Sequence, residues 1–180
     1  MLLAADLGGR HVEVRDLRPD DARPDESSEW DAWDDDRIPD DGQPEHHRAA
    51  VTLDGEVVGT MSWHRIAYGP TRGSWAWSMG IGLAPEWRGR GIGSVAQRLL
   101  SDHLLDSAHR VEASTDVDNL AEQRSLEKAG FSREGVLRGA QYRADGIHHD
   151  LVMYARTRTH RGAASPAGQG AREGGDTLAG

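Results

Sequence analysis

The 180-residue chain contains no cysteine and no long hydrophobic run. The absence of cysteine excludes disulfide bonds, thiolate metal ligands and a cysteine nucleophile, so any group transfer would be direct or would use another nucleophile. No run reaches the ~18 apolar residues that a membrane span needs, and residues 1–9 lack both the basic start and the apolar stretch of a signal peptide. We therefore expect a cytoplasmic protein with no membrane contact.

Composition predicts a single domain between two dispensable ends. Residues 1–10 are interpreted as an N-terminal leader, and residues 11–156 as a core near the usual domain size of about 100 to 150 residues. From residue 157 onward, Gly, Ala, Ser and Arg dominate without periodicity, so residues 157–180 are predicted to be a disordered tail.

The negative charge is concentrated between residues 16 and 45, which contain thirteen Asp or Glu and three Arg, whereas the whole chain carries −9. Because acidic side chains beside aromatic rings suit a cationic or amine-bearing ligand, Trp30, Trp33, Asp34 and Asp35 are candidate substrate-binding residues. A solvated acidic loop fits the same composition. The charge argues against nucleic acid as a partner, since phosphates would be repelled.

A glycine-rich stretch at residues 88–93 lies between a predicted strand at 74–83 and a predicted amphipathic helix that begins at residue 92 and ends near residue 107. The first N–H groups of a helix lack partners, and the helix dipole is positive there. Gly91 and Gly93 carry no side chain that would keep a phosphate away. The stretch therefore predicts an anion-binding loop.

Four interpretations of this loop can be compared. A Walker loop requires a lysine that is missing. A dinucleotide-binding fingerprint requires a third glycine where Ser94 stands, and its turn should follow the strand directly, whereas residues 84–87 intervene. A glycine-rich turn with solvated arginines remains open. The fourth interpretation is the pyrophosphate loop of an acetyltransferase.

Two ordered motifs carry a family resemblance. Residues 83–93, Leu-Ala-Pro-Glu-Trp-Arg-Gly-Arg-Gly-Ile-Gly, resemble the acetyl-CoA motif of the GNAT acetyltransferase superfamily. Asn119-Leu120-Ala121, followed by Leu-Glu-Lys-Ala-Gly-Phe at 126–131, resembles the superfamily's Asn-x-Ala segment and its Glu-Lys-x-Gly-Phe ending. The opening Arg-Asp-Leu-Arg-Pro at 15–19 and the closing His-Asp-Leu-Val-Met-Tyr at 149–154 look most like the ribosomal-protein alanine N-acetyltransferase branch.

The resemblance implies an α/β (α+β) fold, the GNAT acyltransferase fold, with a mixed central sheet of about six to seven strands and flanking helices. Its central parallel strands splay apart, and acetyl-CoA lies in the opening. It implies direct acetyl transfer, within a ternary complex, to a primary amine of a small molecule, an antibiotic or a peptide or protein N-terminus. The cofactor-binding residues that it implies are Leu83, Arg88, Gly89, Arg90, Gly91, Ile92, Gly93, Ser94 and Asn119.

Residue patterns place further elements around these motifs. Asp54-Gly55 predicts a two-residue hairpin turn between strands. The strand at 74–83, the helix after it and a strand at 110–114 form a β-α-β unit whose strands should be parallel. Asn119 with Glu122 forms a capping box, worth about 1 kcal/mol without any ligand. Other predicted strands cover residues 50–53, 56–65, 134–141 and 147–156, and a second helix covers 119–128.

The sequence departs from the family where protons are usually transferred. Many members have Glu where Ser78 stands and Tyr where Leu126 stands. His64 is the first candidate for the base because imidazole titrates near neutrality. His149 and Asp150 on the last strand are further candidates, within reach of the site through water.

Other possibilities remain open. The amine could arrive neutral, and the protein could be a non-catalytic acyl-CoA-binding or regulatory module, since fold does not settle function. A nicotinamide-dependent enzyme is a third function class. Adjacent histidines at 46–47 and 148–149 would point to opposite faces of a strand, so no metal is expected. Trp75 and Trp77 share one strand face, where they build either the core or a homodimer surface.

Overall fold

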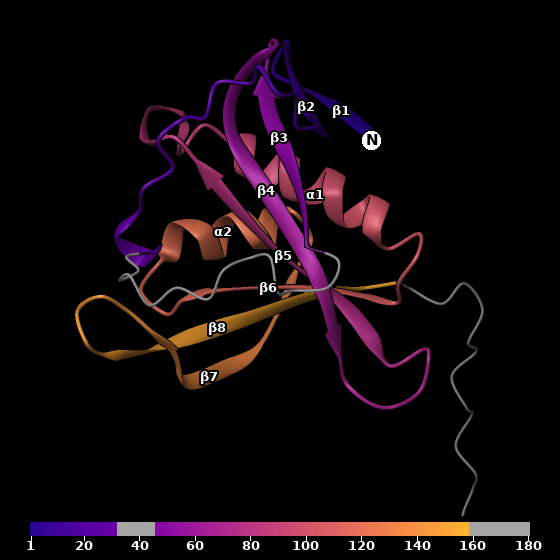
Figure 1. The fold of residues 1–180 in the computed structure, drawn as a ribbon, viewed down its shortest axis with the longest axis vertical. Coiled ribbons are helices and arrows are strands. Elements are labelled where there is room, and N and C mark those ends of the chain that lie inside the picture. The colour runs from indigo at the N-terminus through magenta and orange to yellow at the C-terminus, as the bar shows by residue number, and fades with distance from the viewer. Residues whose placement is uncertain (32–45, 159–180) are drawn as a thin grey trace, which may run out of the picture.

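The computed structural model describes residues 1–31 and 46–158 (Figure 1). In this part of the chain, eight strands form one mixed sheet in the order β1-β2-β3-β4-β5-β6-β8-β7. The elements are β1 (Leu2–Leu7), β2 (Arg10–Asp16), the 3-10 turn η1 (Glu29–Asp31), β3 (His47–Leu53), β4 (Glu56–Ala67), β5 (Trp75–Leu83), the 3-10 turn η3 (Pro85–Trp87), α1 (Ile92–Leu104), β6 (Arg110–Asp116), α2 (Leu120–Lys128), β7 (Ser132–Tyr142) and β8 (His148–Thr157).

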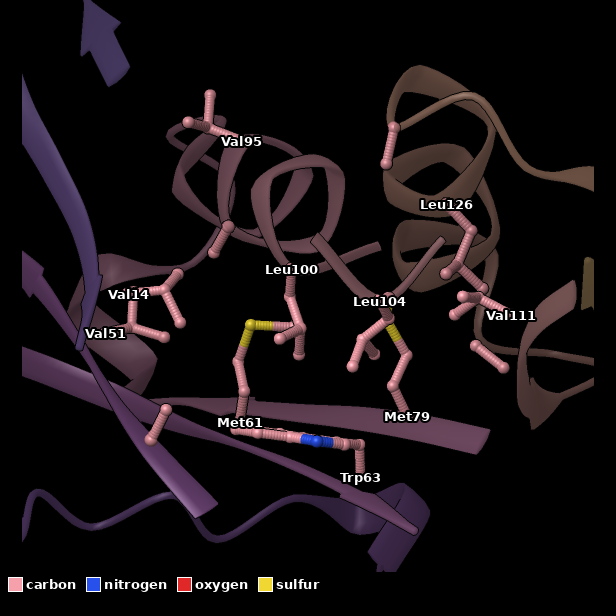
Figure 2. Packing of buried hydrophobic residues seen from close by; sticks show 14 of the residues in the cluster. Val14, Val51, Met61, Trp63, Met79, Val95, Leu100, Leu104, Val111 and Leu126 are labelled. Atoms are coloured by element: carbon pink, nitrogen blue, oxygen red, sulfur yellow. The ribbon is translucent and has the colours of Figure 1, made fainter. Parts of the chain in front are cut away.

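The core lies between the sheet and the two α-helices (Figure 2). The apolar stripe predicted for α1 is buried and faces alternate residues of the strands, so that Leu100 and Leu104 meet side chains such as Met61 and Met79. Burial of a large aliphatic side chain stabilises the fold by about 1.5–3 kcal/mol. None of the helices in the described part is both long and apolar enough to cross a bilayer.

The splay predicted between the central strands is confirmed. β5 and β6 are parallel, and their pairing is limited to Trp77 with Val111 and Ser78 with Glu112. Beyond this point the strands diverge toward their C-terminal ends (Figure 1), and β6 pairs along its whole length with β8. Because α1 connects β5 to β6, its N-terminus lies where the two strands separate.

The N-terminal residues differ from the leader predicted over residues 1–10. Leu2–Leu7 form β1, which pairs antiparallel with β2 after a turn at Gly8 and Gly9, both of which have positive φ. Leu3 and Leu7 pack against the core. The sheet therefore has eight strands, whereas six or seven were expected. The extra strand is β1, whose signal is a short alternation of side chains followed by a Gly-Gly turn.

Several local predictions are confirmed. Asp54 and Gly55 both have positive φ, as the predicted two-residue hairpin turn between β3 and β4 requires. Trp77 is buried in the core, and Trp75 packs edge-on against it at 5.2 Å between ring centroids, which supports the core interpretation of this pair. Of the tail predicted over 157–180, residues 159–180 lie outside the described residues.

Candidate active site

A cleft of about 730 Å³ opens where β5 and β6 separate. One wall is the segment at residues 26–30, and the loop before α1 and the helix α2 form further walls. The floor comes from β5 residues 79–83 and β6 residues 113–116. The cleft is thus built from segments far apart in sequence, and its shape follows from the separation of the two parallel strands.

The glycine-rich loop adopts backbone conformations that only glycine adopts easily. Gly89 and Gly91 have φ values of 72° and 83°, and Gly91 is the N-cap of α1. As glycine, Gly91 supplies no side-chain cap to the first N–H groups of the helix. These donors begin at Ile92 beside the cleft, where the helix dipole is positive, so the loop can accept an anion.

Most of the residues predicted to bind the cofactor surround the cleft. Arg90 and Ile92 are not among the lining residues: the Arg90 guanidinium lies over the Trp87 ring at 5.0 Å, and the Ile92 side chain is buried in the core. The predicted residues that line the cleft are Leu83, Arg88, Gly89, Gly91, Gly93, Ser94 and Asn119.

Arg88 makes contacts that its sequence position did not predict. Its Nε donates to the carbonyl oxygen of Leu83 at 2.8 Å, and Nη2 donates to the carbonyls of Ser27 at 2.7 Å and Glu26 at 3.2 Å. The side chain therefore ties the segment at 26–27 to the end of β5. These contacts connect the wall at residues 26–30 to the floor of the cleft, and the cofactor role that the resemblance implies for Arg88 stays a prediction.

Asn119 is the N-cap of α2, as predicted, while its backbone N–H, which Glu122 would bind in a full capping box, donates to the carbonyl of Asp116 at 3.1 Å. The Oδ1 of Asn119 accepts from the backbone N–H of Glu122 at 3.2 Å, while Nδ2 donates to Thr115 Oγ1 at 3.1 Å. The Glu122 carboxylate in turn accepts from the side chain of buried Gln97, which links α2 to α1. Asn119 is thus held at the cleft by both ends of its amide.

Two basic residues of α2, Arg124 and Lys128, line the same wall. They lie one turn apart, so both side chains project from one face of the helix. Together with the start of α1 they give this wall a positive character that suits the phosphates of a nucleotide. The sequence shows only that Arg124 and Lys128 have helical spacing. It does not indicate that the face of α2 that carries them lines the cleft.

Glu26 lies on the wall at residues 26–30, and its carboxylate packs against β5. Its Oε2 accepts from Thr60 Oγ1 at 2.9 Å, and a Cβ added at Gly82 would lie 2.6 Å from that oxygen. Its Oε1 is buried and has no hydrogen-bond partner among the described residues. Burial raises the pKa of this carboxyl, whereas the hydrogen bond from Thr60 and the charges of Arg48 and Arg88 lower it.

His64 was the first candidate for a base, but it does not line the cleft. It lies on β4 opposite Ser78, and its ring stacks on that of His46 with 6.0 Å between centroids. Burial, and then the charge of His46, lower the pKa of the imidazole, and Glu112 opposes this effect. A catalytic role for His64 stays a prediction.

His149 and Asp150 are likewise absent from the lining. His149 Nε2 lies 2.8 Å from Asp145 Oδ2, and its Nδ1 lies 3.6 Å from Oδ2 of Asp116. Asp116 itself lines the cleft. Asp150 Oδ1 accepts from the N–H of Gly139 at 2.6 Å, which ties β8 to β7. His149 therefore contacts a residue of the cleft lining without lining the cleft itself.

Of the predicted substrate-binding residues, Trp30 lines the cleft beside Glu26 and Glu29. The wall at residues 26–30 thus combines an aromatic ring with two carboxylates. Trp33, Asp34 and Asp35 lie outside the described residues.

A mixed sheet that opens between two parallel strands above a glycine-rich helix start defines the GNAT fold of N-acetyltransferases. The acetyltransferase (GNAT) family matches residues 12–131, and the chain belongs to this family. It is 33% identical over 114 residues to the probable N-acetyltransferase YjcK of Bacillus subtilis (strain 168), a match that covers 62% of this chain and 61% of YjcK.

Solved structures agree with this assignment. Mycobacterium smegmatis RimJ in complex with CoA-disulfide matches with a TM-score of 0.55 and 28% identity, over 62% of this chain and 53% of RimJ. The ribosomal L7/L12 alpha-N-protein acetyltransferase RimL in complex with coenzyme A matches with a TM-score of 0.54 and 27% identity, over 62% of each chain. The chain thus spans between about half and two thirds of the length of these relatives.

Proposed function

We propose that the protein is a cytoplasmic N-acetyltransferase that moves an acetyl group from acetyl-CoA directly to a primary amine. The observation that carries the proposal is the cleft between β5 and β6, which joins an anion-binding helix start to an acidic and aromatic wall. Acetyl-CoA supplies an acetyl group activated as a thioester. The glycine-rich loop, Ser94 and the basic residues of α2 fit its phosphates, and the floor of the cleft fits its pantetheine arm.

In this proposal the end of β5 orients the acetyl group. The N–H of Ala84 donates to the carbonyl of Val58 on β4 at 3.0 Å. Because consecutive residues of a strand direct their amides to opposite sides, the N–H of Leu83 is directed toward the opening and can polarise a carbonyl oxygen there. Such positioning is worth about 7–11 kcal/mol in favourable intramolecular reactions.

The acceptor would approach along the wall at residues 26–30. Two carboxylates and the ring of Trp30 favour a protonated amine by charge attraction and cation–π contact. A small molecule, an antibiotic and a peptide or protein N-terminus all carry such a group. That RimL is an alpha-N-protein acetyltransferase supports the last of these.

A second candidate function is a non-catalytic acyl-CoA-binding module. It is favoured by the absence of a family-type base at Ser78 and by Leu126, which is fully buried and has no proton to give to a departing sulfur. The two functions differ in turnover. Incubation with acetyl-CoA and a panel of polyamines, aminoglycosides and short peptides should release free thiol if the protein is an enzyme, and none if it is a binding module.

The cofactor site can be tested with Gly93→Val. A Cβ at Gly93 would lie 3.2 Å from Ser125 Oγ on α2 and 3.7 Å from Leu83 Cδ1 on β5. The larger side chain of valine would therefore project into the cleft between α2 and the end of β5. We expect calorimetry to show at least ~10-fold weaker binding of coenzyme A, about 1.4 kcal/mol. The matched control is Gly135→Val on β7, where a Cβ meets nothing within 4 Å. Equal affinity in the two variants would refute the proposed site.

A further inference from the structure

We propose that the carboxylate of Glu26 is the group that takes the proton from the acceptor amine. The inference deepens the proposed function and rests on it. It places the base in the segment before β3, whereas the sequence analysis predicted a base on the strands, at His64, His149 or Asp150. Glu26 lines the cleft, and His64, His149 and Asp150 do not.

Contacts of the described residues fix Glu26 relative to the expected position of the thioester. Arg88 donates to the carbonyl of Leu83 through Nε and to the carbonyl of Glu26 through Nη2. One rigid guanidinium therefore links the end of β5 to the backbone that carries the carboxylate. A base must lie within hydrogen-bond reach of the proton that it abstracts. The Arg88 link keeps the backbone of Glu26 close to the end of β5, where the thioester carbonyl is expected.

The strand itself leaves room for the carboxylate. Gly82 has no side chain, and a Cβ there would lie 2.6 Å from Oε2 of Glu26. Any larger residue at position 82 would displace the carboxylate from β5. Thr60, which is paired with Gly82 across β4 and β5, donates to the same oxygen at 2.9 Å. Two neighbouring strands thus set the position of one oxygen, Oε2, and leave Oε1 for another partner.

Glu26 Oε1 has no such partner. It is the one buried side-chain nitrogen or oxygen without a hydrogen bond among residues 1–31 and 46–158. Buried polar atoms are nearly always hydrogen-bonded, because an unpaired acceptor removed from water costs about 1–3 kcal/mol. Because Oε1 is covered in this structure, a donor in the cleft would reach it once the carboxylate turns toward the cleft. An ammonium or amine group would then supply the missing hydrogen bond. The unpaired oxygen is therefore explained if it receives a ligand.

The surrounding charges suit a proton acceptor. Burial favours the neutral carboxylic acid, while Arg48 on β3, Arg88 and the Thr60 hydroxyl favour the carboxylate. Burial is the largest of these effects, so the pKa of Glu26 is raised and the carboxylate is more basic than a solvated glutamate.

The transfer then balances as follows. The acceptor ammonium gives one proton to Glu26, which leaves a nitrogen lone pair. The lone pair forms the N–C bond with the acetyl carbonyl carbon, and the C–S bond breaks as sulfur departs with its electron pair. The second proton of the nitrogen goes to the departing thiolate. The products are an amide and the free thiol, and Glu26 returns its proton to solvent.

The test compares Glu26→Gln with wild type on an acceptor found in the panel. Glutamine keeps the shape of glutamate but cannot take a proton, so kcat should fall by about 10²- to 10⁴-fold while the dissociation constant of coenzyme A stays unchanged. The matched control is Glu13→Gln, because Glu13 Oε2 also accepts from a strand threonine, Thr52, at 3.2 Å, away from the cleft. Glu13→Gln should keep the kcat of wild type.

Two further readouts separate catalysis from structure. In wild type kcat/KM should decrease as pH falls and Glu26 becomes protonated, and this acidic limb should be missing in Glu26→Gln. Carboxyl 13C NMR of glutamate-labelled protein, assigned with Glu26→Gln, should show a pKa above the ordinary ~4.3 of glutamate. Glu26→Asp, which keeps the carboxylate, should recover part of kcat.

Different failures point to different errors. If wild type neither binds coenzyme A nor acetylates any amine, the proposed function is wrong. If wild type turns over and Glu26→Gln keeps its kcat and acidic limb, only the role of Glu26 is wrong. A pKa at or below ~4.3 for Glu26 would also overturn that role.

Discussion

At the scale of single residues, the sheet face that carries Ser78 and His64 is polar and half-buried, and it holds one buried carboxylate. Glu112, paired with Ser78 across β5 and β6, is 2% exposed. Its Oε2 accepts from Tyr68 Oη at 2.5 Å and from Arg110 Nε at 2.9 Å. The hydrogen bond to Glu134, and then that to Glu112, raises the pKa of Arg110. Burial, and then the hydrogen bond to Glu112, raises the pKa of Tyr68. A buried carboxylate persists because its oxygens are hydrogen-bonded and paired.

His64, on the same face, should make stability depend on pH. Its pKa in the folded protein is lowered mainly by burial, so below the ordinary 6.5 the unfolded chain binds more protons than the folded protein. The contribution of His64 is therefore fully present above about pH 6.5 and is lost as pH falls through the lowered pKa. Urea unfolding between pH 7 and 5 should show a shallower loss of stability for His64→Gln than for wild type.

The exposed His103 of α1 supplies the control for this measurement, because His103→Gln changes no buried group. If His64→Gln and wild type lose stability in parallel, burial of His64 does not control the pH dependence.

The predictability of the candidate site differs from residue to residue. Gly91 and Asn119 could be predicted from local signals: Gly91 belongs to a glycine-rich stretch just before an amphipathic helix, and Asn119 is a good N-cap residue at the start of α2. Glu26 could not, because its position depends on Thr60 and Gly82, which are 34 and 56 residues away. The contacts of Arg88 were missed for the same reason, since its carbonyl partners at 26–27 come from another segment.

At the scale of elements, local periodicity predicted α1, α2 and the strands from β3 to β8 with end points that differ by a few residues. Each of these elements has an apolar stripe or a turn signal that operates within about ten residues. The separation of β5 and β6 followed from the family resemblance instead. No residue pattern in either strand specifies where pairing stops, because that depends on how β8 takes up the other edge of β6.

At the start of α2, two substitutions can separate the role of Asn119 as a helix cap from its predicted role in cofactor binding. Asn119→Ala removes the acceptor for the N–H of Glu122, so the free energy of unfolding measured in urea should fall by about 1 kcal/mol. Asn119→Ser keeps a capping oxygen and should restore that stability. If Asn119 also contacts the cofactor through its amide, both variants should bind coenzyme A more weakly by calorimetry.

The Ser variant decides between the roles. Normal affinity together with normal stability in Asn119→Ser would show that Asn119 acts as a cap alone.

At the scale of the whole molecule, β1 connects the edge of the sheet to the candidate site. β1 pairs with β2, which in turn packs under α1, so the first strand lies beside the helix whose start forms the anion-binding loop. A Cβ at Gly91 would lie 3.6 Å from Leu7 Cδ1. The strand that the sequence did not predict therefore supports the backbone turn of the proposed cofactor site.

Substitution on the two faces of β1 tests this support. Leu7 is half-buried against the core, whereas Leu2 of the same strand is 65% exposed. Leu7→Ser should lower the free energy of unfolding by about 1–2 kcal/mol, since part of a leucine side chain loses its apolar contacts. It should also weaken binding of coenzyme A, because the turn at Gly91 loses its neighbour. Leu2→Ser, with the same chemical change on the solvent face, should alter neither quantity, and equal effects of the two substitutions would contradict a link between β1 and the loop.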